Sequence, residues 1–246
     1  MKIIKQESVN ALTATGPSER VSSKYKFISS GQFIEDMRIN GWDLVNTVNR
    51  TRTGLGKHAM RFRNPALKLR AGDFLEIVVL NSHDGTTSFQ LSLGIYRLVC
   101  ANGLVVGKNI IQPVYIRHVG YAAEKVKTAL ASLIEQSQRI QELVDRLQAR
   151  VLSVEEYTAF VNAALIIRGL TPHKVSAEQL HVPRREEDKG LNAWAVLNRI
   201  QEYSVNGFEY TDLEEQRLKT ARRLTGAHPQ IKVNGALFDA ITKIAA

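Results

Sequence analysis

The sequence has one cysteine, few aromatic residues and no long hydrophobic run. Because Cys100 has no second cysteine to pair with, neither an intramolecular disulfide nor a thiolate metal site can form within one chain. No stretch approaches the ~20 apolar residues that a membrane span needs, and the first ten residues do not resemble a signal peptide. We therefore expect a cytoplasmic protein that has no membrane partner.

The sequence also lacks the motifs of the common catalytic sites. No phosphate-binding loop with a following Lys-Ser/Thr pair is present, and Gly54-Leu55-Gly56 lacks the third glycine. The six histidines are scattered, and no two stand at metal-ligand spacing with a glutamate. We expect no ATP use, no cofactor and no resident metal. One catalytic alternative stays open, a metal-dependent nuclease built from Asp73, Glu76 and Asp84.

Acidic residues are absent from one long segment, between Asp43 and Asp73. The segment contains seven basic residues within residues 50–70, which we call the basic stretch. They are Arg50, Arg52, Lys57, Arg61, Arg63, Lys68 and Arg70, with His58 among them. The net charge of the chain is +9, and residues 1–130 supply all of it, with 18 Lys+Arg against 9 Asp+Glu. Such a local excess of positive charge is typical of a nucleic-acid-binding surface.

The spacing of the basic stretch predicts a hairpin with one cationic face. Arg61 and Arg63 alternate with Met60 and Phe62, and side chains two apart in a strand point to the same face. Burying unpaired arginines is costly, so this face must be solvated or must meet an anion. Arg97 and Lys108 are candidates to extend the same groove.

Aromatic platforms for stacked bases are scarce, since Phe, Trp and Tyr make up 7% of the chain. Phe62 and Tyr96 lie near basic residues, but the alternation favours a place in the core for both. This composition favours binding along the phosphate backbone over binding by base stacking.

The hydrophobic pattern predicts an α+β fold, in which an antiparallel sheet with a basic hairpin packs on a long helix. We expect a flexible N-terminal arm at 1–25, a nucleic-acid-binding core at 26–152 and a helical C-terminal region at 153–246. Helices are expected at 31–39, 121–150, 153–168, 191–203, 211–224 and 235–244. Strands are expected at 42–53, 58–63, 74–81, 89–100, 104–106 and 114–118.

Several short motifs resemble a known family. They are Gly41-Trp42, KHAMRFR at 57–63, NSHDGTTS at 81–88, GIYRLVCANGLVV at 94–106, RHVG at 117–120, NAW at 192–194 and VNGAL at 233–237. Together they resemble the uncharacterised phage/plasmid-like protein family, domain-of-unknown-function family 932, over roughly residues 25–246. The resemblance implies an association with mobile elements and implies no particular activity.

The order of the elements also resembles that of the single-strand annealing recombinases of the Rad, Red and Erf type. A short helix, a hairpin, further strands and a long helix follow one another, and Asn40-Gly41-Trp42 stands at the junction of helix and strand. The likeness implies ring-shaped oligomers and a DNA groove lined by the hairpin, here Arg50, Arg52, Lys57, Arg61 and Arg63. Extra strands before the long helix and a helical C-terminus depart from that pattern, so this is an analogy of fold.

The sequence thus favours an ATP-independent protein that binds and anneals single-stranded DNA in phage or mobile-element recombination. We expect a homo-oligomer with single-stranded DNA, or RNA, as its ligand. The alternative is a protein-interaction module that uses the basic face to inhibit a host nuclease or defence complex.

Overall fold

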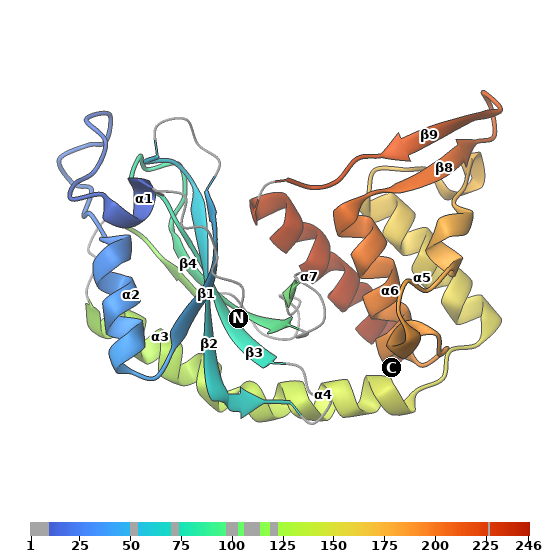
Figure 1. The fold of residues 1–246 in the computed structure, drawn as a ribbon, viewed down its shortest axis with the longest axis horizontal. Coiled ribbons are helices and arrows are strands. Elements are labelled where there is room, and N and C mark those ends of the chain that lie inside the picture. Colours follow the sequence, from blue (N-terminus) through green and yellow to red (C-terminus); the bar gives the residue numbers. More distant parts are fainter. Residues whose placement is uncertain are drawn as a thin grey trace. The chain divides into compact units, whose positions relative to one another are not determined.

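The computed structural model describes residues 10–49, 54–69, 74–96, 103–105, 114–118, 123–225 and 227–246. The chain divides into two compact units, coloured along the sequence in Figure 1. Unit 1 comprises Met1–Leu69, Phe74–Gly94 and Pro113–Glu135, and unit 2 comprises Arg70–Asp73, Ile95–Gln112 and Gln136–Ala246. Helices occur together with antiparallel strands, which confirms the predicted α+β class.

Unit 1 is a sheet accompanied by helices. Its elements are α1 (Asn10–Thr13), α2 (Ser30–Ile39), β1 (Asp43–Asn49), β2 (His58–Lys68), β3 (Phe74–Asn81), β4 (Phe89–Tyr96), β6 (Val114–Ile116) and α3 (Ala123–Glu135). The strands run in the order β1-β2-β3-β4, and β6 pairs with β4. β2 is antiparallel to both of its neighbours, so the predicted hairpin is present.

The core of unit 1 lies between the sheet and α2. Met60 and Phe62 of β2 are fully buried, which confirms that they face away from Arg61 and Arg63. Phe33 of α2 packs edge-on against Phe62, with ring centroids 5.5 Å apart. β3 is buried on both faces, which accounts for the continuous apolar run Ile77-Val78-Val79-Leu80 in its sequence.

The N-terminal segment is attached to this core from residue 10 onward. Ala11 is fully buried, and its carbonyl oxygen accepts a hydrogen bond of 2.7 Å from His83 Nε2. Lys26 N donates to the carbonyl oxygen of His118, whose Nδ1 donates back to Lys26 O. The Tyr25 ring stacks on His118 with centroids 4.5 Å apart. Of the arm predicted at 1–25, residues 1–9 lie outside the described residues.

Unit 2 is mainly helical. Its helices are α4 (Ser137–Ala149), α5 (Val154–Ile167), α6 (Ala193–Asn206) and α7 (Ala227–Ile244), with short 3-10 turns at Pro172–Lys174, Glu178–His181 and Glu186–Asp188. Its strands are β5 (Gly103–Val105), β7 (Val175–Ser176), β8 (Phe208–Asp212) and β9 (Arg217–Ala221), of which the last three form an antiparallel sheet. The helix predicted at 153–168 is present as α5, and it begins with a capping box of reciprocal bonds between Ser153 and Glu156.

The single helix predicted at 121–150 is wrong in its continuity. The structure has two consecutive helices, α3 and α4, with Gln136 between them. An apolar stripe without proline or glycine gives no signal for this break, because a one-residue interruption leaves the helical period almost unchanged.

The helix predicted at 211–224 is also wrong, since this segment belongs to the β8–β9 hairpin. The segment begins with contacts like those of a helix cap, because Asp212 Oδ1 accepts from the backbone N–H groups of Glu214 and Glu215 at 3.0 Å. Such a side chain stabilises a tight turn as readily as a helix start. Gln216 has φ of 50° and turns the chain back into β9.

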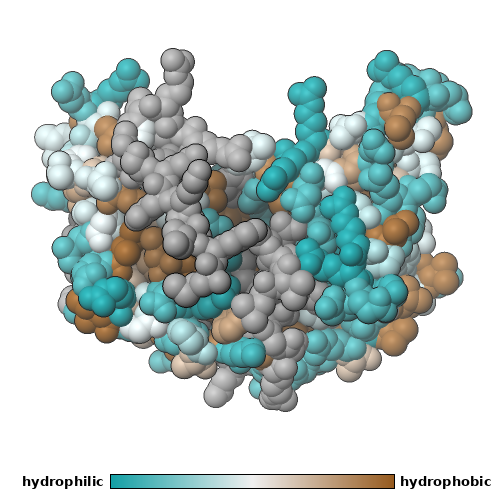
Figure 2. Space-filling view, in the orientation of Figure 1, coloured by the Kyte–Doolittle hydropathy of each residue, from teal (hydrophilic) through white to brown (hydrophobic). Residues whose placement is uncertain are grey.

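The last helix is longer than predicted, because α7 begins at Ala227 and not at Gly235. Pro229 lies in its first turn, where the missing N–H costs no intrahelical bond. No helix within the described ranges is long and apolar enough to cross a membrane. On the face shown in Figure 2 the hydrophobic residues of the described surface lie among hydrophilic ones.

Candidate nucleic-acid interface

Two arginines of the basic stretch bind a buried carboxylate. Glu76 on β3 is 0% exposed, and its Oε2 accepts a hydrogen bond of 2.7 Å from Arg61 Nε. Its Oε1 accepts from Arg63 Nε at 2.8 Å and from Arg63 Nη2 at 2.6 Å. We call these three residues the arginine–glutamate cluster. The anion that the arginines were expected to meet is therefore supplied, in part, by the protein itself.

The register of the hairpin produces this cluster. Arg63 stands directly opposite Glu76 in the antiparallel pair of β2 and β3, and Arg61 stands opposite Val78. Alternation places Arg61, Arg63 and Glu76 on the same face of the sheet. The cluster holds two positive charges and one negative charge, so it keeps a net charge of +1.

An aromatic ring adjoins the cluster. Arg63 Cζ lies 4.3 Å from the centroid of the half-buried Phe74 ring, and Lys68 Nζ lies 5.8 Å from the same centroid. A register shift in β2 between Arg63 and Lys68 brings both side chains to this ring. Cations at such distances from an aromatic face are attracted to it. The arrangement combines positive charge with a flat apolar surface.

Of the described cations in the basic stretch, the exposed ones are Lys57, just before β2, and Lys68, at the end of β2. Within the part of the chain that the structure describes, neither lysine has an acidic partner. An exposed lysine without an internal counter-ion is available to an external anion.

His58 occupies a different environment from its neighbour Lys57, because its side chain is buried. Its Nδ1 donates to Gly56 O at 3.0 Å, so its Nε2 accepts from the Ser30 hydroxyl at 2.7 Å. That hydroxyl accepts in turn from Asn81 Nδ2 at 3.0 Å. Burial lowers the pKa of His58 to about 4, which keeps the ring neutral at physiological pH. The structure therefore places His58 in the core and away from any surface ligand.

The remaining predicted site residues lie outside the described residues. They are Arg50, Arg52, Arg70, Arg97 and Lys108. The described part of the candidate site consequently comprises Lys57, Arg61, Arg63 and Lys68.

The carboxylates considered for a nuclease site have other partners where they are described. Glu76 is bound by two arginines, and Asp84 Oδ1 accepts from the N–H and the hydroxyl of Thr86 in its own turn. Asp73 lies outside the described residues. Among the residues that the structure describes, no three histidine, cysteine or acidic side chains are placed to hold a metal ion.

Sequence reasoning missed Phe74 as part of this site and left the direction of Glu76 undetermined. The signal that identifies both is their position two residues apart, on the face that pairing brings against Arg63. That signal becomes readable only once the register of β2 against β3 is known.

Comparisons with known proteins place the chain beside relatives of unassigned activity. The model of the family described as Domain of unknown function (DUF932) matches residues 17–227. In Escherichia coli K12, the UPF0380 protein YfjQ is 32% identical over 184 residues, and the UPF0380 protein YafZ is 31% identical over 183 residues. Each match covers 74% of this chain and 66% of the relative, so the chain spans less than two thirds of their length. No solved structure gives a significant match.

Proposed function

Since the chain belongs to the DUF932 family, whose description names no activity, we propose from its own residues that it binds single-stranded DNA through the phosphate groups. We further propose that it does so without ATP, as an oligomer that promotes annealing in phage or mobile-element recombination. The observation that carries the proposal is the cationic face of β2, where Arg61 and Arg63 bind the carboxylate of Glu76 and Lys68 lies beside Phe74.

The chemistry of this face fits a phosphate ligand. Glu76 holds the two guanidinium groups in fixed positions, so little side-chain entropy is lost when an anion binds beside them. The net charge of +1 in the cluster, with Lys57 and Lys68 at either end of β2, provides attraction along the strand. A backbone held by its phosphates leaves its bases available for pairing with a second strand.

Phe74 adds a contact that suits a single strand in particular. Bases of single-stranded nucleic acids stack on aromatic side chains that lie beside basic residues. In a duplex the bases are already stacked on one another, so they are not available to stack on Phe74. The preference for single strands is therefore expected to depend on this ring.

The proposal is tested by fluorescence anisotropy of a labelled single-stranded oligonucleotide over a series of salt concentrations. The variant Lys57→Ala/Lys68→Ala removes two exposed cations and leaves the arginine–glutamate cluster intact. We expect weaker binding and a salt slope smaller by about 1.4, because each phosphate contact on a single strand contributes about 0.7.

A matched control is Lys24→Ala/Lys26→Ala, which removes the same charge from exposed lysines outside the basic stretch. Equal effects of the two double variants would mean that net charge alone matters, and the proposed site would be wrong. Weak binding that is insensitive to salt would favour the alternative, a basic face that docks onto a host protein. In that case a pull-down with the unchanged chain is the next measurement.

A further inference from the structure

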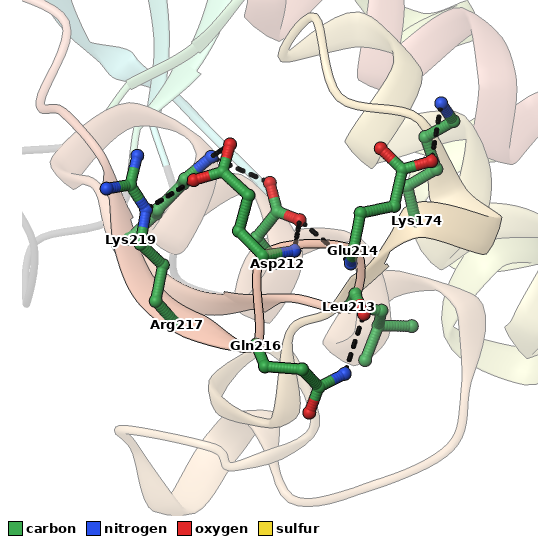
Figure 3. A network of polar contacts seen from close by, with 8 residues as sticks. Lys174, Asp212, Leu213, Glu214, Gln216, Arg217 and Lys219 are labelled. Carbon is green, nitrogen blue, oxygen red and sulfur yellow. Dashed lines mark hydrogen bonds and ion pairs between the residues drawn. The ribbon is translucent and has the colours of Figure 1, made fainter.

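The basic residues at the turn of the β8–β9 hairpin have acidic partners close by. Lys219 Nζ lies 2.7 Å from both Asp212 Oδ2 and Glu215 Oε1, and Arg217 Nε pairs with Glu215 (Figure 3). The hydrogen bond from Lys219 lowers the pKa of Asp212 to about 2, so this carboxylate stays ionised at physiological pH. The turn thus supplies its own counter-ions.

The end of β9 differs, because two adjacent arginines follow it and a third arginine donates to the backbone there. Arg168, just after α5, donates from Nη2 to the backbone carbonyl oxygen of Arg222 at 2.6 Å, and Arg223 is the next residue. Gly207 lies close against the same backbone: a Cβ at that position would lie 2.7 Å from Ala221 O and 3.0 Å from Arg223 N. We call Arg168, Arg222 and Arg223 the arginine triad.

The charges of the arginine triad are not neutralised by the residues that the structure describes. None of its three side chains forms an ion pair with a described acidic residue, and Arg222 and Arg223 are exposed. The Nε of Arg168 is buried without a hydrogen-bond partner, and burial lowers the pKa of its guanidinium. A positive charge without an internal counter-ion is available to an external anion.

We propose that the arginine triad binds the phosphate groups of a nucleic-acid strand and so provides unit 2 with a phosphate contact of its own. The inference rests on the proposed function for its ligand, but it concerns residues that the basic stretch does not include. Guanidinium groups match phosphate with two parallel hydrogen bonds, and all three residues are arginine and none is lysine. A strand of nucleic acid offers phosphates at a repeated spacing, which suits adjacent cations such as Arg222 and Arg223.

The test uses the full chain and the same labelled single-stranded oligonucleotide. Arg222→Ala/Arg223→Ala removes two exposed side chains and keeps the carbonyl oxygen that Arg168 binds. We expect affinity to fall and the salt slope to decrease by about 1.4. Arg222→Lys/Arg223→Lys keeps the charge and is expected to retain most of the slope while losing affinity, since the guanidinium fork is lost.

The matched control is Arg139→Ala/Arg146→Ala, which removes two exposed arginines from α4 in the same unit. Circular dichroism of each variant excludes a folding defect. Binding by Arg222→Ala/Arg223→Ala that equals the control, while Lys57→Ala/Lys68→Ala weakens binding, overturns this inference and leaves the proposed function standing. If Arg222→Ala/Arg223→Ala weakens binding and Lys57→Ala/Lys68→Ala does not, the triad is supported and the basic stretch is excluded as the DNA contact. Binding to poly-glutamate is measured in parallel. If Arg222→Ala/Arg223→Ala loses that binding and keeps its DNA binding, the triad belongs to an acidic protein partner and the inference is overturned.

Discussion

Glu76 is the residue on which the position of Arg61 and Arg63 depends. Both of its carboxylate oxygens accept hydrogen bonds from these arginines, and no part of the side chain reaches solvent. A buried carboxylate is tolerated only when it is paired and hydrogen-bonded in this way. The two arginines depend on Glu76 in turn, because their guanidinium groups lose a common counter-ion if this carboxylate is changed.

We predict that Glu76→Gln destabilises unit 1 by about 3–5 kcal/mol, the usual cost of leaving one side of a buried ion pair uncompensated. Each unit has one buried tryptophan, Trp42 in unit 1 and Trp194 in unit 2. Urea unfolding followed by tryptophan fluorescence in a Trp194→Phe background therefore reports on unit 1 alone.

The control for this prediction is Glu35→Gln, which makes the same chemical change at an exposed ion pair with Arg38 on α2. Exposed pairs contribute little, so its unfolding midpoint should stay close to that of the background. Similar shifts for the two variants would show that Glu76 is not the buried counter-ion described above.

At the scale of elements, the β8–β9 hairpin depends on the close approach of its second strand to the end of α6. Gly207 has φ of 94°, a conformation that L side chains rarely adopt, and its missing Cβ leaves room for the carbonyl oxygen of Ala221. Either condition alone favours glycine, and here they coincide.

We predict that Gly207→Ala destabilises unit 2 by more than the ~1–2 kcal/mol expected for a positive φ, because the added methyl group also collides with backbone. The matched control is Gly169→Ala, where φ is 77° and a Cβ would meet nothing within 4 Å. Urea unfolding followed by Trp194 fluorescence in a Trp42→Phe background compares the two. A cost for Gly207→Ala no larger than that of the control would contradict the close approach.

Local patterns predicted some of these elements well and others poorly. Alternation of Met60 and Phe62 with basic residues was sufficient to predict the two faces of β2, because burial enforces the strand period. Ser153 and Asp212 both make cap-like contacts, but only the first begins a helix. The outcome depends on the residues after the cap: a long apolar segment comes after Ser153, and polar residues that turn back come after Asp212. The partner of Arg63 depends on a strand pairing that no local pattern contains.

At the scale of the whole molecule, the buried histidines make stability depend on pH. Burial lowers the pKa values of His58, His83 and His118, that of His58 to about 4. The folded state therefore binds fewer protons than the unfolded state below about pH 6.5. The contribution of the neutral histidines to stability is fully present above that pH, and it falls as pH decreases towards 4.

We predict that His58 alone accounts for a loss of about 2 kcal/mol in the unfolding free energy of unit 1 between pH 7 and pH 5. The measurement is urea unfolding at each pH, again with Trp42 as the reporter. His58→Gln should be less stable at pH 7 but should lose less on acidification, because one titrating group is gone. A stability that is constant over this interval would contradict the burial of these rings.

Contacts divide the chain into two compact units near residue 136. The boundary expected near residue 152, between a nucleic-acid-binding core and a helical region, stays a prediction. Composition separates a basic half from a neutral half, but it carries no information about which residues a segment packs against.

The hydrogen bonds that attach the N-terminal segment also determine when unit 1 can complete its folding during synthesis. Ala11 binds a histidine 72 residues later, and Lys26 binds one 92 residues later. At ~5–20 residues per second, a nascent chain emerging from a ribosome waits several seconds before these partners exist. Throughout that interval Ala11 has no core to enter, so unit 1 closes late in translation although its first residues are made first.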